Sequence, residues 1–181
     1  ERYFGNIPPA PPIDRVGRMD SAIQGQVTLT MRDKVQLPRL YLVWPTGPLF
    51  CKNQAALDIL STILGDGKSS RLYRSLVYER QIAQDVTVAH SSEEIAGEFF
   101  VESTASPGHT LEEIESVVRE ELARASREPP GEKEVQQAKN RIESHHLLQL
   151  EHIGGFGGRA DQLNYYNTLG GNPSLINSDL E

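Results

Sequence analysis

The sequence predicts an α+β fold in which a mixed or antiparallel sheet is covered on one face by helices. Alternation of apolar and polar residues indicates short strands in pairs, and apolar residues at helical spacing indicate helices between and after them. The expected order is strand, strand, helix, helix, strand, strand, then further helices. With 181 residues and 38% hydrophobic content, one domain with a sizeable core is expected.

The first four elements follow from local patterns. Apolar residues at the odd positions of 27–31 alternate with polar ones, which predicts a half-buried strand, and 40–44 predicts a more fully buried strand. Helical spacing then predicts helices over 53–64 and 70–80. The second of these helices opens on serines, which are suited to capping.

Two more strands are expected over 82–88 and 99–105, and we expect them to form an antiparallel pair. In the first of them, alternation places four residues together: Ile82, Gln84, Val86 and Val88. A helix with an apolar stripe over 111–122 follows, with Thr110 placed to cap it. Another stripe begins at Val135, includes Ala138, Ile142, His145 and Leu148, and ends at the glycines of 154–158.

Both ends of the sequence suggest a piece of a longer protein. Prolines in 1–20 predict an extended linker and lead-in, so the single α+β domain is expected over 21–181. The first residues do not have the pattern of a secretion signal. The last ones, from Pro173, resemble a helix that has just begun.

Composition excludes several function classes. A net charge of −7 disfavours nucleic acid as a partner, and no apolar run reaches the roughly 20 residues that span a bilayer. The only cysteine, Cys51, cannot form an internal disulfide and is expected to act as a small hydrophobe instead of a nucleophile. A single cysteine leaves the redox compartment open.

Two nucleotide-binding motifs are only partly matched. Gly67-Lys68-Ser69 reproduces the end of a phosphate-binding loop, but Thr62 stands where the first glycine belongs and a helix, not a strand, precedes it. The glycines of 155–160 satisfy a loose dinucleotide fingerprint, again after a helix, so helix termination is the better interpretation.

No catalytic or metal-binding residue is predicted in this chain. Histidines 145, 146 and 152 are six and seven residues apart, roughly 9 to 10 Å along a helix, which is too far for two rings to share one zinc ion. We expect His145 to be a packed core residue and His152 a helix-end cation. A solvated helix face is the interpretation for a group of acidic residues: Glu112, Glu113, Glu115, Glu120 and Glu121.

Four ordered blocks carry a resemblance to a known family: 36–45, 67–73, 81–86 and 151–164. Over 35–179 the chain resembles the pitrilysin/insulinase family of zinc metallopeptidases, and specifically the metal-free C-terminal type of domain in large bacterial members. The family's His-x-x-Glu-His zinc motif is missing here. The resemblance therefore implies no cofactor in this chain and a zinc ion in a partner domain.

The resemblance also implies five candidate substrate contacts. In active members the metal-free domain lends an arginine and, seven residues later, a tyrosine to the substrate, and here Val77 and Gln84 occupy those positions. Gly65, Gly67 and Lys68 resemble a shortened glycine-rich loop that could guide substrate, although a plain turn between helices is the simpler interpretation. Arg71 and Tyr73, in the same block, are expected to pack against the domain.

The function expected from the resemblance is that of a non-catalytic domain of a zinc metallopeptidase homologue. It would line a peptide-binding chamber and support a homologous zinc-bearing domain, in the same polypeptide or in a partner subunit. The alternative is a structural or peptide-binding scaffold without peptidase activity anywhere in the protein, and an independent hydrolase is third. Similar proteins favour the bacterial periplasm or cell envelope, with the cytoplasm as the other location.

Overall fold

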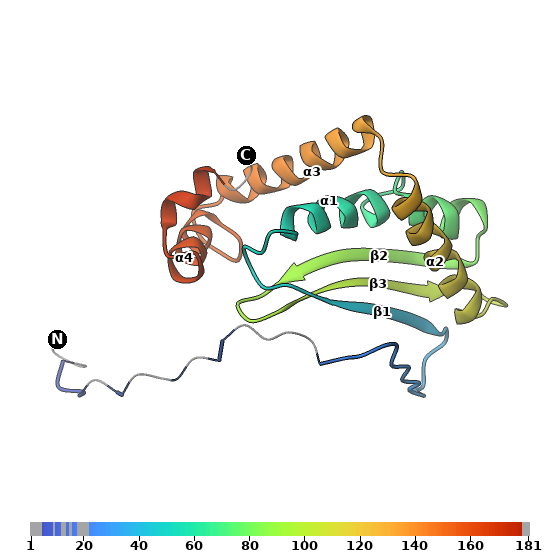
Figure 1. Cartoon of the computed structure of the whole chain (residues 1–181), viewed down its shortest axis with the longest axis horizontal. Coiled ribbons are helices and arrows are strands. Elements are labelled where there is room, and N and C mark those ends of the chain that lie inside the picture. Colours follow the sequence, from blue (N-terminus) through green and yellow to red (C-terminus); the bar gives the residue numbers. More distant parts are fainter. Residues whose placement is uncertain (1–4, 9, 12–13, 15, 18–21, 179–181) are drawn as a thin grey trace.

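The computed structural model describes residues 5–8, 10–11, 14, 16–17 and 22–178. Its sheet contains β1 (Arg39–Thr46), β2 (Ala83–Ser92) and β3 (Gly97–Ala105) in the order β1-β3-β2. Both pairings are antiparallel, so the predicted pair formed by β2 and β3 is confirmed. Figure 1 shows the helices gathered over one face of this sheet, which confirms the α+β fold.

Within the described residues, six helical segments accompany the sheet: α1 (Gln54–Gly65), η1 (Tyr73–Glu79), α2 (Leu111–Arg127), α3 (Glu132–Glu151), α4 (Arg159–Leu169) and η2 (Pro173–Asn177). The four helices predicted over the middle of the chain are all present. Helix α1 lies along the sheet, and α3 lies on the far side of α1 (Figure 1). Helix η1 is wound more widely than predicted, because the Arg80 N–H bonds to the carbonyl of Ser75, five residues earlier.

The core lies between the sheet and the helices. Its largest fully buried apolar side chains come from α1, η1 and its lead-in, β3 and α2: Leu64, Leu72, Leu76, Val101, Ile114 and Val118. The helix α2 carries the predicted apolar stripe, and Thr110 and Glu113 form the expected capping box at its start. On β1 the even-numbered residues face this core, whereas Tyr41 and Val43 are 60% and 53% exposed on the uncovered face.

The prediction of a strand over 27–31 is wrong. This segment pairs with no strand in the part of the chain that the structure describes. Val27, Leu29 and Met31 are 77%, 82% and 84% exposed. A strand requires a neighbour to bond its backbone, and alternation alone does not supply one.

At the start of β2, the residues that are buried also differ from the prediction. A bulge between Ala83 and Asp85 shifts the register, so Ala83 and Val86 are both buried while Gln84 is exposed. Alternation predicted Gln84 on the same face as Val86, and an extra residue in one strand breaks that alternation.

The stripe predicted on α3 holds only for its first half. Ala138 is buried and Ile142 is half-buried, but His145 and Leu148 are exposed. The expectation that His145 is a packed core residue is therefore wrong. The reason is length, since α3 has 20 residues whereas α1, against which it packs, has 12.

The chain ends are only partly described. Of the predicted linker over 1–20, the described residues belong to no helix or strand, and Pro9 and Pro12 lie outside the described residues. At the other end, a short 3-10 helix begins at Pro173 as predicted, with Asn172 bonding the Ser174 N–H. Among the described helices, none has the length and apolar character needed to cross a membrane.

Candidate functional site

Three of the five candidate residues lie where α1 ends and the turn to η1 begins: Gly65 is the last residue of α1, and Gly67 and Lys68 lie in the turn. Gly67 adopts a φ of +77°, which confirms the interpretation of a glycine turn between helices. Arg141 of α3 covers this turn: its guanidinium bonds the Asp66 carbonyl and lies 3.1 Å from the Asp66 carboxylate. A Cβ at Gly67 would lie 2.8 Å from Arg141 Nη1. The turn is thus packed against the guanidinium of Arg141.

Gly65 has a packing role of its own. It ends α1 at the point where the helix meets β2. A Cβ at this position would lie 2.4 Å from Cβ of Val88 and 2.7 Å from its backbone nitrogen. Only glycine permits this approach of helix and strand, so Gly65 sets the position of the turn that carries Lys68.

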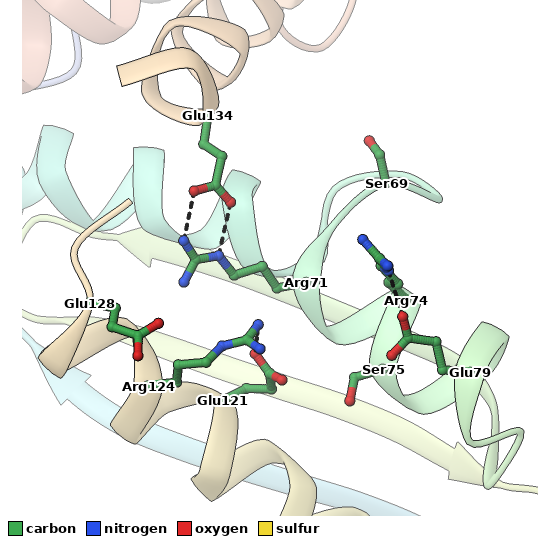
Figure 2. Close-up of a pocket in the computed structure, with 9 residues that line it drawn as sticks. All are labelled: Ser69, Arg71, Arg74, Ser75, Glu79, Glu121, Arg124, Glu128 and Glu134. Atoms are coloured by element: carbon green, nitrogen blue, oxygen red, sulfur yellow. Dashed lines mark hydrogen bonds and ion pairs between the residues drawn. The ribbon is translucent and has the colours of Figure 1, made fainter. Parts of the chain in front are cut away.

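A charged cleft of roughly 390 Å³ opens beside this turn (Figure 2). Its lining comes from η1 and its lead-in, from α2, and from the chain around the start of α3: Ser69, Arg71, Arg74, Ser75, Glu79, Glu121, Arg124, Glu128 and Glu134. Arg71 donates two hydrogen bonds to Glu134, of 2.9 and 2.7 Å, so it packs in a structural role as expected.

The cleft also corrects one sequence interpretation. Glu121 was expected on a solvated face of α2, but it is only 5% exposed and forms an ion pair of 2.6 Å with Arg124. An acidic residue can be buried there because a cation one helical turn away compensates its charge. Sequence patterning detected the acidic face but not the local cleft that buries one member of it.

Arg71 and Glu134 perturb each other's protonation. The hydrogen bonds from Arg71, aided by the Gly131 N–H, hold the pKa of Glu134 below its ordinary value, and the pKa of Arg71 is raised by the same pair. A carboxylate with a lowered pKa stabilises the folded state above its unfolded pKa of about 4.3 and loses this contribution as the pH falls through its folded pKa.

We expect Glu134→Gln to lower the free energy of unfolding at pH 7 by about 1 kcal/mol or less, because the pair is partly exposed and screened by solvent. Glutamine keeps an acceptor for the Gly131 N–H, so the change isolates the charge. Urea unfolding from pH 7 to pH 3 measures the effect. The variant and the wild type should converge below about pH 4, and a gap that stays constant with pH would contradict the assignment.

The other two candidates, Val77 and Gln84, are separated by the end of η1. Val77 is half-buried and packs against the core, while Gln84 is exposed at the bulge of β2. Of their neighbours, Tyr78 is exposed and Arg80 forms an ion pair of 3.0 Å with Glu120 of α2. Neither of the two candidates offers a cation, and their contact with substrate stays a prediction.

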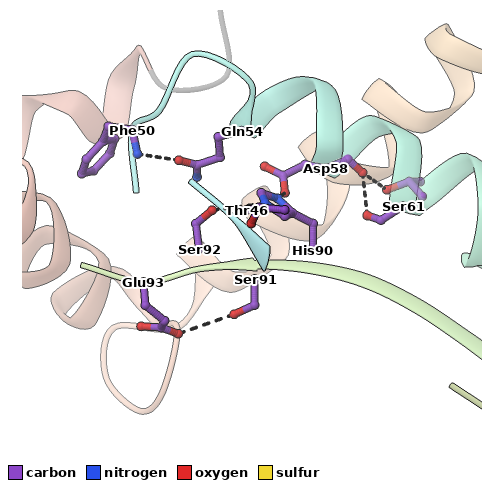
Figure 3. Close-up of polar contacts among 10 residues, drawn as sticks. Thr46, Phe50, Gln54, Asp58, Ser61, His90, Ser91, Ser92 and Glu93 are labelled. Atoms are coloured by element: carbon purple, nitrogen blue, oxygen red, sulfur yellow. Dashed lines mark hydrogen bonds and ion pairs between the residues drawn. The ribbon is translucent and has the colours of Figure 1, made fainter. Parts of the chain in front are cut away.

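A polar cluster that sequence reasoning missed lies at the opposite end of α1 (Figure 3). The His90 side chain is 1% exposed, with Nδ1 2.7 Å from Asp58 Oδ1. Its Nε2 lies 3.2 Å from Thr46 Oγ1 and 3.3 Å from Ser92 Oγ. The order carboxylate, imidazole, hydroxyl is that of a hydrolase triad. Because the ring is buried and contacts α1 and both outer strands, we assign it a structural role that holds these elements together.

The described side chains do not fit a zinc ion. No group of three or more histidine, cysteine, aspartate or glutamate residues is arranged to hold a metal within the described residues. On α3, His145 is exposed and its Nε2 lies 3.1 Å from Nε2 of Gln149, while His152 follows the last residue of the helix, as predicted. These rings do not converge on one point, and no step of chemistry is assigned to a metal in this chain.

Comparison with known proteins places the chain in a family. The model described as "Peptidase M16 inactive domain" matches residues 1–142, and the chain belongs to this family. It is thus an inactive domain of a zinc metallopeptidase family, which confirms the pitrilysin/insulinase resemblance. No curated protein matches the chain.

Solved structures share the fold at low sequence identity. A protease from Helicobacter pylori is 21% identical, with a TM-score of 0.71 over 82% of this chain and 35% of that one. The inactive peptidase domain of a candidate zinc protease from Bordetella parapertussis is 19% identical, with a TM-score of 0.67 over 82% and 78%. A candidate zinc protease from Bordetella pertussis Tohama I is 19% identical, with a TM-score of 0.68 over 82% and 79%. The chain spans about a third of the Helicobacter protein.

Proposed function

We propose that this chain supports a zinc-bearing peptidase domain and lines a chamber in which that domain cleaves peptides. The observation that carries the proposal is which side chains occupy two positions. At these positions active members of the family place an arginine and a tyrosine that contact the substrate. Val77 presents an apolar side chain packed against the core, and Gln84 presents a neutral amide. Neither can supply a cation to a peptide carboxylate, so the role that remains is support and enclosure.

The partner in this proposal is a homologous zinc-bearing domain of the same polypeptide or of a partner subunit. The uncovered face of the sheet, with Tyr41 and Val43, is the part of the wall we assign to peptides, since aromatic and aliphatic side chains bind extended peptides without fixing their sequence. Gly65, Gly67 and Lys68 lie on the other, helix-covered side of the sheet, so we propose them as a separate contact with substrate. We propose the bacterial periplasm or cell envelope as its location, by likeness to related proteins.

The proposal predicts that the full-length parent protein cleaves fluorogenic peptides in a chelator-sensitive manner, whereas the isolated 181-residue chain does not. Zinc titration by calorimetry should show stoichiometric binding to the parent and none to the isolated chain. A zinc-free, inactive parent would instead establish the scaffold alternative. Chelator-sensitive cleavage by the isolated chain would overturn the proposal.

A substitution at Val77 tests its role directly. In the parent protein we expect Val77→Ala to lower the free energy of unfolding by about 1 kcal/mol, because part of a half-buried side chain is removed from the core. Turnover per folded molecule should change less than about twofold. Unchanged thermal unfolding together with strongly reduced turnover would assign Val77 to the substrate instead.

A further inference from the structure

We propose that residues 26–32 form a docking strand, which adds to an open sheet edge in a neighbouring domain of the parent polypeptide. The inference rests on the proposed function, which supplies that neighbouring domain. The docking strand has the period-two alternation and the β-branched residues of a strand, so in an extended conformation three apolar side chains would project on one side: Val27, Leu29 and Met31.

The backbone of the docking strand is unused. None of its residues forms a backbone hydrogen bond to another backbone group in the part of the chain that the structure describes. Among the described residues, its side-chain hydrogen bonds involve Gln26 alone, which donates to Thr28 at 3.4 Å and accepts from Arg119 of α2 at 3.0 Å. The bond to Arg119 holds one end of the segment beside the domain while its apolar side chains remain exposed.

Exposure of this kind is a hazard for a protein. Exposed strands are usually protected by charges, prolines or bulges, because unpaired backbone groups beside apolar side chains recruit other strands. Between Gln26 and Met31 the chain has no charged residue and no proline, and the charges begin only at Arg32, the last residue of the docking strand. The lack of protection along its apolar part indicates that the docking strand is covered in the intact protein.

The domain's own sheet does not provide the cover. β1 pairs with β3 on one side only, so its other edge is free among the described residues, and just six residues separate it from the docking strand. Figure 1 shows residues 22–37, which precede β1, running past the sheet without joining it. The docking strand does not pair with the free edge of β1 in its own chain. A second copy would offer the same edge at a much lower effective concentration, so it is a poorer partner still.

A neighbouring domain fits the dimensions. Seven residues extend over about 23 Å, which matches an ordinary sheet strand such as β1 with eight residues. The Helicobacter protease continues well beyond the third of its length that this chain covers, so a parent of that size has room for further domains. The partner edge should belong to a sheet with a helix-covered core, because the three apolar side chains need an apolar layer on one face.

Residue-resolved hydrogen exchange tests the docking strand in the full-length parent. A strand added to an edge bonds through alternate residues, so every second amide in 27–31 should exchange at least about 100-fold more slowly than its neighbours. In the isolated chain all of them should exchange fast. Fast exchange at every position in the parent, or concentration-dependent protection in the isolated chain, would overturn the proposal. The readout needs no peptidase activity, so an inactive parent would refute the proposed function alone.

A matched pair of substitutions locates the covered face. We expect Leu29→Asp to reduce the protection of the alternate amides in the parent by about tenfold or more, because it places a charge against the apolar layer. Thr28→Asp, one residue away on the opposite face, should reduce it less than about threefold. Equal loss in the two variants would refute addition to a sheet with one covered face.

Discussion

Replacement of Gly65 by alanine is expected to lower the free energy of unfolding by about 3 kcal/mol. The new Cβ would lie 2.4 Å from Cβ of Val88 and 2.7 Å from its backbone nitrogen, both well inside contact distance. Neither atom can move by a change of rotamer, so α1 has to shift away from β2. The gain of about 1 kcal/mol in helix propensity from glycine to alanine is smaller than this cost.

Urea unfolding of three variants checks the result. Gly154→Ala is the matched control, because its Cβ would meet nothing within 4 Å, and its effect should stay within about 0.5 kcal/mol. Val88→Ala should not rescue Gly65→Ala, since alanine removes Cγ2 but keeps Cβ and the backbone nitrogen, two of the three atoms that clash. If Gly65→Ala left stability unchanged and reduced peptide turnover in the parent, Gly65 would be a substrate contact and not a packing residue.

The helices were predictable because their signals are local. The stripe over 111–122 and the Thr110 capping box lie within one segment, and the structure reproduces both. The strand over 27–31 carries an equally clear local pattern, but a strand also needs a partner, which no local pattern supplies. The bulge at Gln84 and the wide winding of η1 are likewise set by packing between elements and not by the order of residues.

In the candidate site too, features set by neighbouring residues were predictable, whereas contacts between distant residues were not. The turn at Gly67 could be read from the sequence, because a glycine between two helical patterns suits a positive φ. The pair of Arg71 and Glu134 could not, since 63 positions separate its members. Only the fold brings the start of η1 and the start of α3 together, and with them the charged cleft.

His90 was missed because its partners Thr46 and Asp58 are distant from it in the sequence. It should stabilise the end of the sheet at which these residues meet. We expect His90→Ala to lower the free energy of unfolding by about 2 to 4 kcal/mol, because it leaves a cavity and removes the contacts that join α1 to the two outer strands. Asp58, which is partly exposed, can turn to water, so the loss should not exceed this range.

Ser92→Ala distinguishes a structural role from a catalytic role of the same cluster. Its hydroxyl lies 3.3 Å from Nε2 of His90, and Thr46 still faces that nitrogen when the serine is removed, so the cost should be below about 1 kcal/mol. If His90 has only a structural role, Ser92 should not react with a fluorophosphonate. Activation of a serine requires a general base hydrogen-bonded to a hydroxyl that the reagent can reach. Stoichiometric labelling of Ser92, lost in His90→Ala under conditions where the variant is folded, would show that these residues act as a triad and that the chain has a hydrolytic centre of its own.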